Sequence, residues 1–350
     1  MSIVHFVVFA SICLSLGLVN LSSTFLFVLA ETNLQDSKGE VKRMILYARD
    51  AIIEVSPSNQ LKPGGVSYGA MTFNGTVPGP WISIYQGDIL EITLVNQADT
   101  VHSLDLHAGY GVSQAVSGSV EPGQNKTLRL NADYPGVFMY HCDGDNLNGI
   151  WEHVASGMYG GIIVHPKNEV VAKEFRIIFS EIFNSADNGI FKGTSGKIGS
   201  FDFNKFLDNK PDLILTNGMA YKYIPFFGDK AKIQLNPNAQ IFKVKPGELT
   251  RWYVINAGPR GNVAFNFAGG LINEKPDTSI SHYNNNKNFS LSKVYEISVP
   301  PGAGSIAEVI FPEVGAYFGN DHDLGRLING AGFVVLATRN STADGDPNGR

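Results

Sequence analysis

One stretch of the sequence gathers side chains that bind soft metals: residues 140–160 read YHCDGDNLNGIWEHVASGMYG. It supplies a thiolate, an imidazole and a thioether, from Cys142, His153 and Met158. Two imidazoles, one thiolate and a weak axial thioether are the ligands of a blue-copper electron-transfer site. Suitably spaced histidines for the missing imidazole occur in VHSLDLHAG, at His102 and His107. The pattern therefore predicts a type 1 copper completed by a histidine from this second segment.

The cysteine count favours a metal ligand over a disulfide. The chain contains two cysteines, and Cys13 lies in an apolar stretch at the N-terminus. Cys142 is then alone in the rest of the chain and cannot form an internal disulfide. A lone cysteine is most often a small buried apolar residue. The histidines and the methionine around Cys142 favour metal binding instead.

The alternation of side chains along a strand predicts a second metal site. If His141 and Cys142 lie on one strand, their side chains point to opposite faces. By the same rule Asp105 and His107 share a face, and His102 takes the other. We therefore expect one site with His102, Cys142, His153 and Met158, and another with His107, His141 and Asp105. The adjacent residues His141 and Cys142 would connect the two sites.

A third imidazole for the second site must come from the remaining histidines. His165 precedes a proline and is expected at the surface, and His282 lies in a polar insertion and is expected to be solvated. His322, in GNDHDLGRL, falls near the end of the strand that matches the Cys142 strand in the second half of the chain. Three imidazoles that leave an open position suit a catalytic copper. The histidines are too few for a trinuclear cluster, which needs about eight imidazoles.

The elements that must position these residues read as β-strands. Short apolar runs alternate with Gly, Pro and Asn turns, and helical periodicity is nearly absent apart from a short helix expected near Leu324–Asn329. QGDILEITLVN (86–96) resembles PGELTRWYVIN (246–256), with glycine and asparagine nine residues apart in both. This duplication predicts an all-β protein with two copies of one sandwich unit, at residues 44–167 and 168–338.

The bulk composition is that of a globular protein, and the N-terminus predicts export. The 350 residues are 43% hydrophobic and carry a net charge of −5, which suggests no binding to nucleic acid or anionic lipid. Residues 1–30 are almost wholly apolar and are expected to be a signal peptide or, if uncleaved, an N-terminal membrane anchor. The functional part would then work in the periplasm, a pseudoperiplasm or outside the cell. Residues 31–43 are expected to be a linker, and 339–350 a disordered tail.

Five short motifs within residues 44–338 carry a family resemblance: MTFNGTVPGP, HSLDLHA, PGVFMYHC, WEHVASGMYG and DHDLGRLINGA. Together they resemble the copper nitrite reductases, a family of two-domain cupredoxins. The resemblance implies two tandem Greek-key β-sandwiches and a homotrimer. It also implies that Asp105 holds the substrate and passes it a proton. It assigns His102, Cys142, His153 and Met158 to type 1 copper, and His107, His141 and a neighbouring subunit's His322 to type 2 copper.

The sequence departs from the family at the expected substrate pocket. Asn266 stands where the family has a second catalytic residue, a histidine, and an amide does not titrate near neutral pH. Ala268 replaces a bulky aliphatic residue that helps to orient nitrite. The loop between Cys142 and His153 is a little longer than is usual in the family. These changes predict a wider pocket with weaker acid–base chemistry.

Three functions remain open from the sequence. The first is reduction of nitrite to nitric oxide, with electrons from a small redox protein. The second keeps both coppers but oxidises a small nitrogen compound, such as hydroxylamine or nitric oxide, or acts on another small substrate. The third is a non-catalytic cupredoxin electron carrier with an empty type 2 site. Retention of the three type 2 histidines and Asp105 argues against the third.

Overall fold

A computed structural model describes residues 39–58, 64–145, 148–185, 201–227, 234–236, 239–275 and 293–339. The expected signal segment 1–30, most of the expected linker, His282 and nearly all of the expected tail lie outside these residues. Residues 38–350 form one compact unit by their contacts. Among the described helices, none has the length and apolar character needed to cross a membrane.

The N-terminal half consists of two four-stranded sheets. Their strand orders are β2-β1-β4-β6 and β3-β10-β7-β5. The strands are β1 (Val41–Ser56), β2 (Val66–Phe73), β3 (Ile82–Tyr85), β4 (Ile89–Asn96), β5 (Asp105–Leu106), β6 (Asn125–Asn131), β7 (Gly136–His141) and β10 (Tyr159–His165). Two short helices and a small hairpin connect them: α1 (Val112–Ala115), α2 (Ile150–Ala155), and β8 (Gly144–Asp145) with β9 (Asn148–Gly149).

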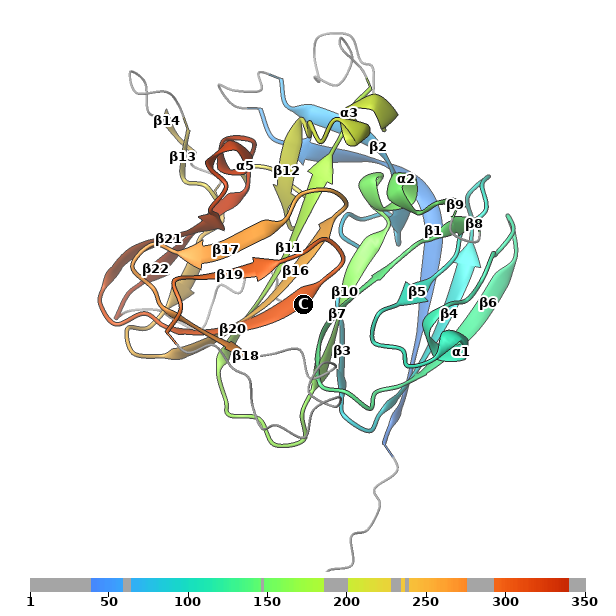
Figure 1. Cartoon of the computed structure of the whole chain (residues 1–350), viewed down its shortest axis with the longest axis horizontal. Coiled ribbons are helices and arrows are strands. Elements are labelled where there is room, and N and C mark those ends of the chain that lie inside the picture. Colours follow the sequence, from blue (N-terminus) through green and yellow to red (C-terminus); the bar gives the residue numbers. More distant parts are fainter. Residues whose placement is uncertain are drawn as a thin grey trace, which may run out of the picture. The chain divides into compact units, whose positions relative to one another are not determined.

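The C-terminal half consists of two five-stranded sheets, drawn from yellow-green to red in Figure 1. Their orders are β12-β11-β16-β20-β18 and β15-β22-β21-β17-β19. The strands are β11 (Lys173–Ile182), β12 (Leu213–Thr216), β15 (Phe242–Val244), β16 (Leu249–Gly258), β17 (Val263–Phe267), β18 (Ile272–Lys275), β19 (Glu296–Val299), β20 (Gly304–Ile310), β21 (Gly315–Asp321) and β22 (Gly332–Ala337). The remaining elements are α3 (Phe203–Leu207), α5 (Leu324–Ile328) and the pair β13 (Phe226–Phe227) and β14 (Gln234–Leu235). The all-β prediction is confirmed, and the short helix expected near Leu324–Asn329 is α5.

The two halves repeat one pairing pattern. In the first, β1 runs parallel to β4, which is antiparallel to β6; in the second, β11 runs parallel to β16, which is antiparallel to β20. The asparagines that end the two similar sequence segments also have the same role. Asn96 donates to the carbonyls of Thr100 and Val120, and Asn256 donates to those of Gly261 and Val299. Each asparagine therefore closes the loop that follows its strand.

Strand β4 is buried on one face, whereas strand β7 is buried on both. The residues of β4 alternate between buried and half-buried, because only one of its faces meets the sandwich core. Every residue of β7 is buried. On one face Phe138 and Tyr140 pack in the N-terminal core, and on the other Val137 and Met139 pack against residues of the C-terminal half. Strand β7 is therefore covered by both halves.

Two expectations from the sequence were wrong. The expected linker at 31–43 ends too late, because β1 begins at Val41 and pairs from there with Ile89 of β4. His165 was expected at the surface but is only 8% exposed. It is the last residue of β10, where Ser83 and Tyr253 contact its ring nitrogens. The contact with Tyr253 of β16 arises because the C-terminal half packs over the end of β10.

Candidate metal sites

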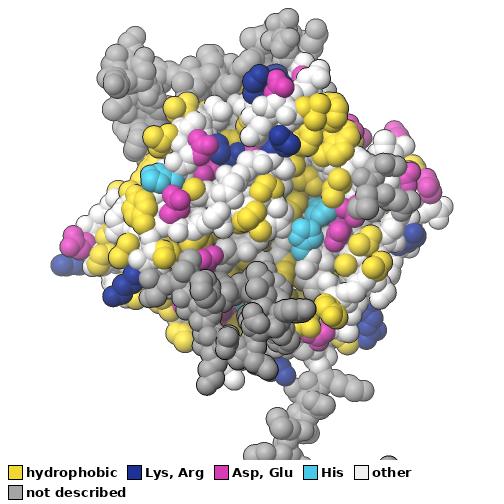
Figure 2. All heavy atoms as spheres, viewed as in Figure 1, with side chains coloured by type: hydrophobic (Ala, Val, Ile, Leu, Met, Phe, Trp, Pro, Cys, Tyr) yellow, Lys and Arg dark blue, Asp and Glu magenta, His cyan; other side chains and the backbone are white. Residues whose placement is uncertain are grey.

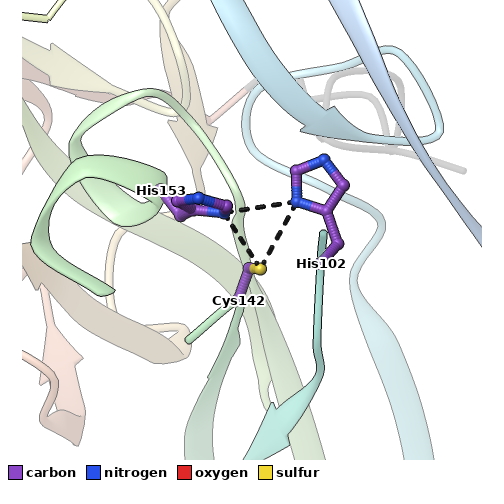
Figure 3. A group of neighbouring side chains, drawn as sticks. All are labelled: His102, Cys142 and His153. Carbon is purple, nitrogen blue, oxygen red and sulfur yellow. Dashed lines mark hydrogen bonds between the residues drawn. The ribbon is translucent and has the colours of Figure 1, made fainter. Parts of the chain in front are cut away.

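Three of the predicted type 1 ligands meet in the N-terminal half (Figure 3). The Nδ1 atoms of His102 and His153 lie 3.2 Å apart. The Cys142 Sγ lies 3.6 Å from Nδ1 of His102 and 3.2 Å from Nδ1 of His153. All three residues are buried. His102 and His107 thus belong to different donor groups, as expected, although only Asp105–Leu106 (β5) between them form a strand.

Backbone hydrogen bonds hold these side chains in place. His102 is fixed by a pair of bonds with Val120, of 3.2 and 2.7 Å. Cys142 directly follows β7, and its amide donates to the carbonyl of Met158 at 3.1 Å. The Met158 amide in turn donates to the carbonyl of His153, in α2, at 3.0 Å. Met158 is fully buried in the same apolar cluster as Cys142.

The spacing of the three donor atoms fits a metal ion. A cation bonded to nitrogen and sulfur at about 2.0–2.3 Å needs ligand atoms roughly 3.3–3.8 Å apart. The observed separations of 3.2 to 3.6 Å lie close to this range. The sulfur also accepts hydrogen bonds from the amides of Ser103 and Gly144, at 3.2 and 3.3 Å. Such bonds stabilise a thiolate, which is the form that binds metal.

The protonation of these groups suits a soft cation. Burial, and then the charge of His153, lower the pKa of His102 to about 4, so that its ring is neutral at physiological pH. Burial raises the pKa of the Cys142 thiol to about 11, despite the bonds from Ser103 and Gly144. The thiol therefore loses its proton when a cation binds beside it, rather than in the metal-free protein.

A second group forms on the other face of the β7 end, from Asp105, His107 and His141. The Nε2 atoms of His107 and His141 lie 2.9 Å apart, with the rings perpendicular. The Nδ1 of His107 donates to the Gly302 carbonyl at 3.0 Å, and the Nδ1 of His141 donates to the Cys142 carbonyl at 3.3 Å. Gly302 belongs to the C-terminal half, so both halves of the chain support this group.

Loss of water from the ring nitrogens lowers the pKa of both His107 and His141. His107 is exposed as a residue, whereas its two ring nitrogens contact His141 and Gly302. Both rings are therefore neutral near pH 7 and available as ligands. A type 2 copper needs such neutral imidazoles, so these two residues also fit the metal.

His322 and Asn266 lie in the C-terminal half, near each other in the strand pairing. His322 follows β21, and its amide donates to the Ala264 carbonyl at 2.8 Å. Its Nδ1 donates to Oε2 of Glu296 at 2.9 Å, and its side chain is 43% exposed. Asn266 lies on β17 and is 2% exposed, and its amide oxygen has no hydrogen-bond partner among the described residues. The group around His107 within one chain does not include His322.

Sequence reasoning missed Asp143 and Gly302 beside the second group, and Glu296 beside His322. Asp143 is buried, with an oxygen 3.2 Å from Nδ1 of His141. Burial, and then the charge of Asp105, raise the pKa of Asp143 to about 6. The position of Asp143, next to Cys142, was a signal that could have suggested a role. Glu296 and Gly302 had no such signal, because their contacts depend on the tertiary fold.

A cavity of about 330 Å³ opens beside the paired histidines. Apart from His107 and His141 its lining is apolar, and it includes Met139, Trp151 and Phe206. On the face shown in Figure 2, histidine side chains reach the surface next to hydrophobic and acidic side chains. The second group is therefore accessible to a small molecule or to another chain.

A third group of donor atoms belongs to His165, Glu169 and Glu174. The guanidinium of Arg251 already pairs with Glu169 at 3.2 Å and with Glu174 at 3.3 Å. A cation placed there would be repelled by the arginine. This group is therefore a structural ion-pair network beside the junction of the two halves.

Comparisons with known proteins find similarity to copper oxidoreductases. The multicopper oxidase family model matches residues 54–169. The copper-containing nitrite reductase of Neisseria meningitidis serogroup A is 30% identical over 270 residues, which cover 76% of this chain and 63% of that protein. The chain spans just under two thirds of the length of this relative and of two other Neisseria copper-containing nitrite reductases.

Solved structures extend the comparison to the whole fold. The copper nitrite reductase from Nitrosomonas europaea superposes with a TM-score of 0.72 at 28% identity, over 88% of this chain and 97% of that chain. The copper-containing nitrite reductase from Thermus scotoductus gives a TM-score of 0.67 at 26% identity, over 86% of this chain and 63% of that chain. The expected cupredoxin fold is confirmed. The chain is therefore similar in sequence and fold to the copper-containing nitrite reductases, and residues 54–169 match the multicopper oxidase family model.

Proposed function

We propose that this protein is a copper oxidoreductase that reduces nitrite to nitric oxide. In this proposal His102, Cys142, His153 and Met158 hold type 1 copper, and His107, His141 and a neighbouring subunit's His322 hold type 2 copper. When bound, the two ions supply one-electron redox chemistry and an open position for a small substrate. The single observation that carries the proposal is that His141 and Cys142 are adjacent, yet each belongs to a different donor group.

The chain's own residues supply a covalent connection and an acid. The peptide bond between His141 and Cys142 joins the two ligand sets directly. Reduction of nitrite to nitric oxide and water takes up one electron and two protons. A small redox protein would supply the electron. Asp105 is half-buried and lies in the same group as His107 and His141, where it would hold the substrate and pass it a proton.

The proposal includes a homotrimer in which each subunit completes its neighbour's type 2 site. Exposed apolar side chains lie near His322: the Tyr295 ring contacts it and is 48% exposed, and Leu324, two residues further along the chain, is 62% exposed. Exposed apolar residues gathered in one place mark interaction surfaces. His107 is exposed on the N-terminal half, near the exposed Tyr110. Contact between these two unlike surfaces, repeated around a ring, would bring His322 to His107 and His141.

Oxidation of a small nitrogen compound is the second candidate. Asn266 favours it, because an amide at this position cannot carry a proton to nitrite as imidazole would. Hydroxylamine or nitric oxide would then be the substrate, and a small redox protein the electron acceptor. A non-catalytic electron carrier is the third candidate, and it requires a type 2 site without copper.

Two measurements separate these candidates. Steady-state assays with nitrite and a reduced donor, run beside assays with hydroxylamine or nitric oxide and an oxidised acceptor, distinguish the two enzymes. Turnover only in the second assay would exclude nitrite reduction. A copper content of about one ion per subunit, with only the type 1 signal in electron paramagnetic resonance, would support the carrier.

We also propose that the protein is exported, through a signal peptide or an N-terminal anchor at residues 1–30. The apolar composition of this segment supports the proposal. Cell fractionation with sequencing of the mature N-terminus tests it. Intact protein in the cytoplasmic fraction would contradict it.

A further inference from the structure

The two histidines of the second group share one pattern of ring contacts. The Nδ1 of His107 donates to the Gly302 carbonyl, and the Nδ1 of His141 donates to the Cys142 carbonyl. A neutral imidazole has one ring hydrogen, so a hydrogen held at Nδ1 leaves Nε2 bare. In both residues the bare Nε2 then faces the position between the rings, where a metal would bind.

His322 has the same pattern, although it lies in the other half of the chain. Its Nδ1 donates to Oε2 of Glu296 at 2.9 Å, which leaves Nε2 bare. The histidines of the first group differ, because His102 and His153 both turn Nδ1 toward the Cys142 sulfur. In its ring contacts His322 therefore resembles His107 and His141 rather than His102 and His153.

The strand pairing holds Glu296 beside His322. Glu296 is the first residue of β19, where it pairs with Asn266 of β17. Strand β21, which ends one residue before His322, pairs with β17 on its other side. The ring of Tyr295 adds an edge contact to His322, with the ring centroids 5.6 Å apart. The pairing of β17 with β19 and β21 therefore holds the Glu296 carboxylate beside the His322 ring.

The exposure of His322 and Glu296 indicates that their contact orients the His322 ring rather than stabilises the fold. The side chains of His322 and Glu296 are 43% and 40% exposed. Exposed pairs of this kind contribute little to the stability of a fold. A hydrogen bond to the outer nitrogen of a ligating histidine, however, sets the tautomer and direction of its ring.

We propose that Glu296 is a positioning residue, which keeps the neutral His322 ring hydrogen on Nδ1 and so presents Nε2 as a ligand to the neighbouring subunit. The choice of His322 as a ligand rests on the proposed function. The effect of Glu296 on the ring does not, because it follows from the contact within one chain.

The tautomer is measured on metal-free protein by nitrogen NMR of the histidine rings, at about pH 8, where ordinary imidazoles are neutral. The wild type should hold the His322 hydrogen on Nδ1. Glu296→Ala should lose this preference, and Glu296→Gln, which keeps a carbonyl acceptor, should retain much of it. Glu313→Ala, which truncates an exposed glutamate in the same half, should leave the tautomer unchanged. A wild-type ring with its hydrogen on Nε2, or an unchanged ring in Glu296→Ala, would overturn the proposal.

Copper titration of the full-length protein gives the second readout. Glu296→Ala should bind the type 2 ion roughly 10- to 100-fold more weakly, with the type 1 absorption intact. Glu296→Gln should recover most of this affinity. Unchanged type 2 affinity in Glu296→Ala would overturn the proposed effect on binding. If the wild type binds no type 2 copper but its tautomer depends on Glu296, the positioning role stands and the proposed function fails.

Discussion

At the residue scale, the adjacent pair His141 and Cys142 determines how the two metal groups are arranged. Cys142 shares a buried cluster with Phe138 and Tyr140, whereas His141 lies on the face of Val137 and Met139. One side chain therefore points into the sandwich core, and the next points toward the junction of the halves. This alternation needs no special backbone, because it is the ordinary geometry of a strand.

Asn266 is the residue that most clearly limits the proposed nitrite chemistry. We expect Asn266→His to raise nitrite turnover by roughly 10²-fold, the typical effect of one added acid–base group. Steady-state turnover with a reduced donor, measured at equal copper content, checks this. No gain, with the type 2 ion still bound, would count against the role assigned to this position.

At the element scale, the contact between β20 and β7 brings the two halves together closely enough to build the second group. A Cβ atom added at Gly304 would lie 2.3 Å from the Val137 carbonyl oxygen. The halves also share an apolar cluster that includes Met139, Tyr159 and Tyr253. Only a residue without a side chain allows the strands to approach at Gly304.

Gly304→Ala should therefore force β20 away from β7. We expect a loss of about 1–3 kcal/mol in the free energy of unfolding, the usual cost of overpacking. Urea denaturation measures this loss. Gly315→Ala is the matched control, because an added Cβ there meets nothing within 4 Å. Equal stability of the two variants would show that the close approach is unimportant.

The sequence predicted those parts of the site that depend on local periodicity. Strand alternation separated His102 and Cys142 from His107 and His141, and similar spacing in the two halves placed His322 at the end of a matching strand. Contacts between the halves could not be predicted in this way. The Gly302 carbonyl reaches His107 from 195 positions away in the chain. His165 was placed wrongly for the same reason, since the residues that bury it come from distant segments.

At the scale of the whole molecule, no third imidazole joins the second group among the residues that the structure describes in one chain. His107 is exposed beside the buried His141, and His322 lies near exposed apolar residues of the C-terminal half. Assembly of identical subunits would bring these surfaces together. The proposed type 2 site would therefore lie between subunits, and the proposed type 1 site wholly inside one.

Complementation between variants tests this arrangement. His107→Ala and His322→Ala should each lose the type 2 signal when expressed alone and keep the type 1 colour. Trimers assembled from both variants should regain part of the type 2 signal, because some interfaces combine an intact His107 with an intact His322. Electron paramagnetic resonance of the purified mixed trimers measures this. Failure to regain any signal in verified mixed trimers would exclude a shared site.

The most direct test of the central claim is the absorption and paramagnetic resonance spectrum of Cys142→Ser beside the wild type, both loaded with copper. The wild type should bind about two ions per subunit and show a strong visible band from the cysteine thiolate. Cys142→Ser should lose that band and one ion, and should keep the type 2 signal. A colourless copper-loaded wild type, or a visible spectrum that is unchanged by Cys142→Ser, would contradict the account.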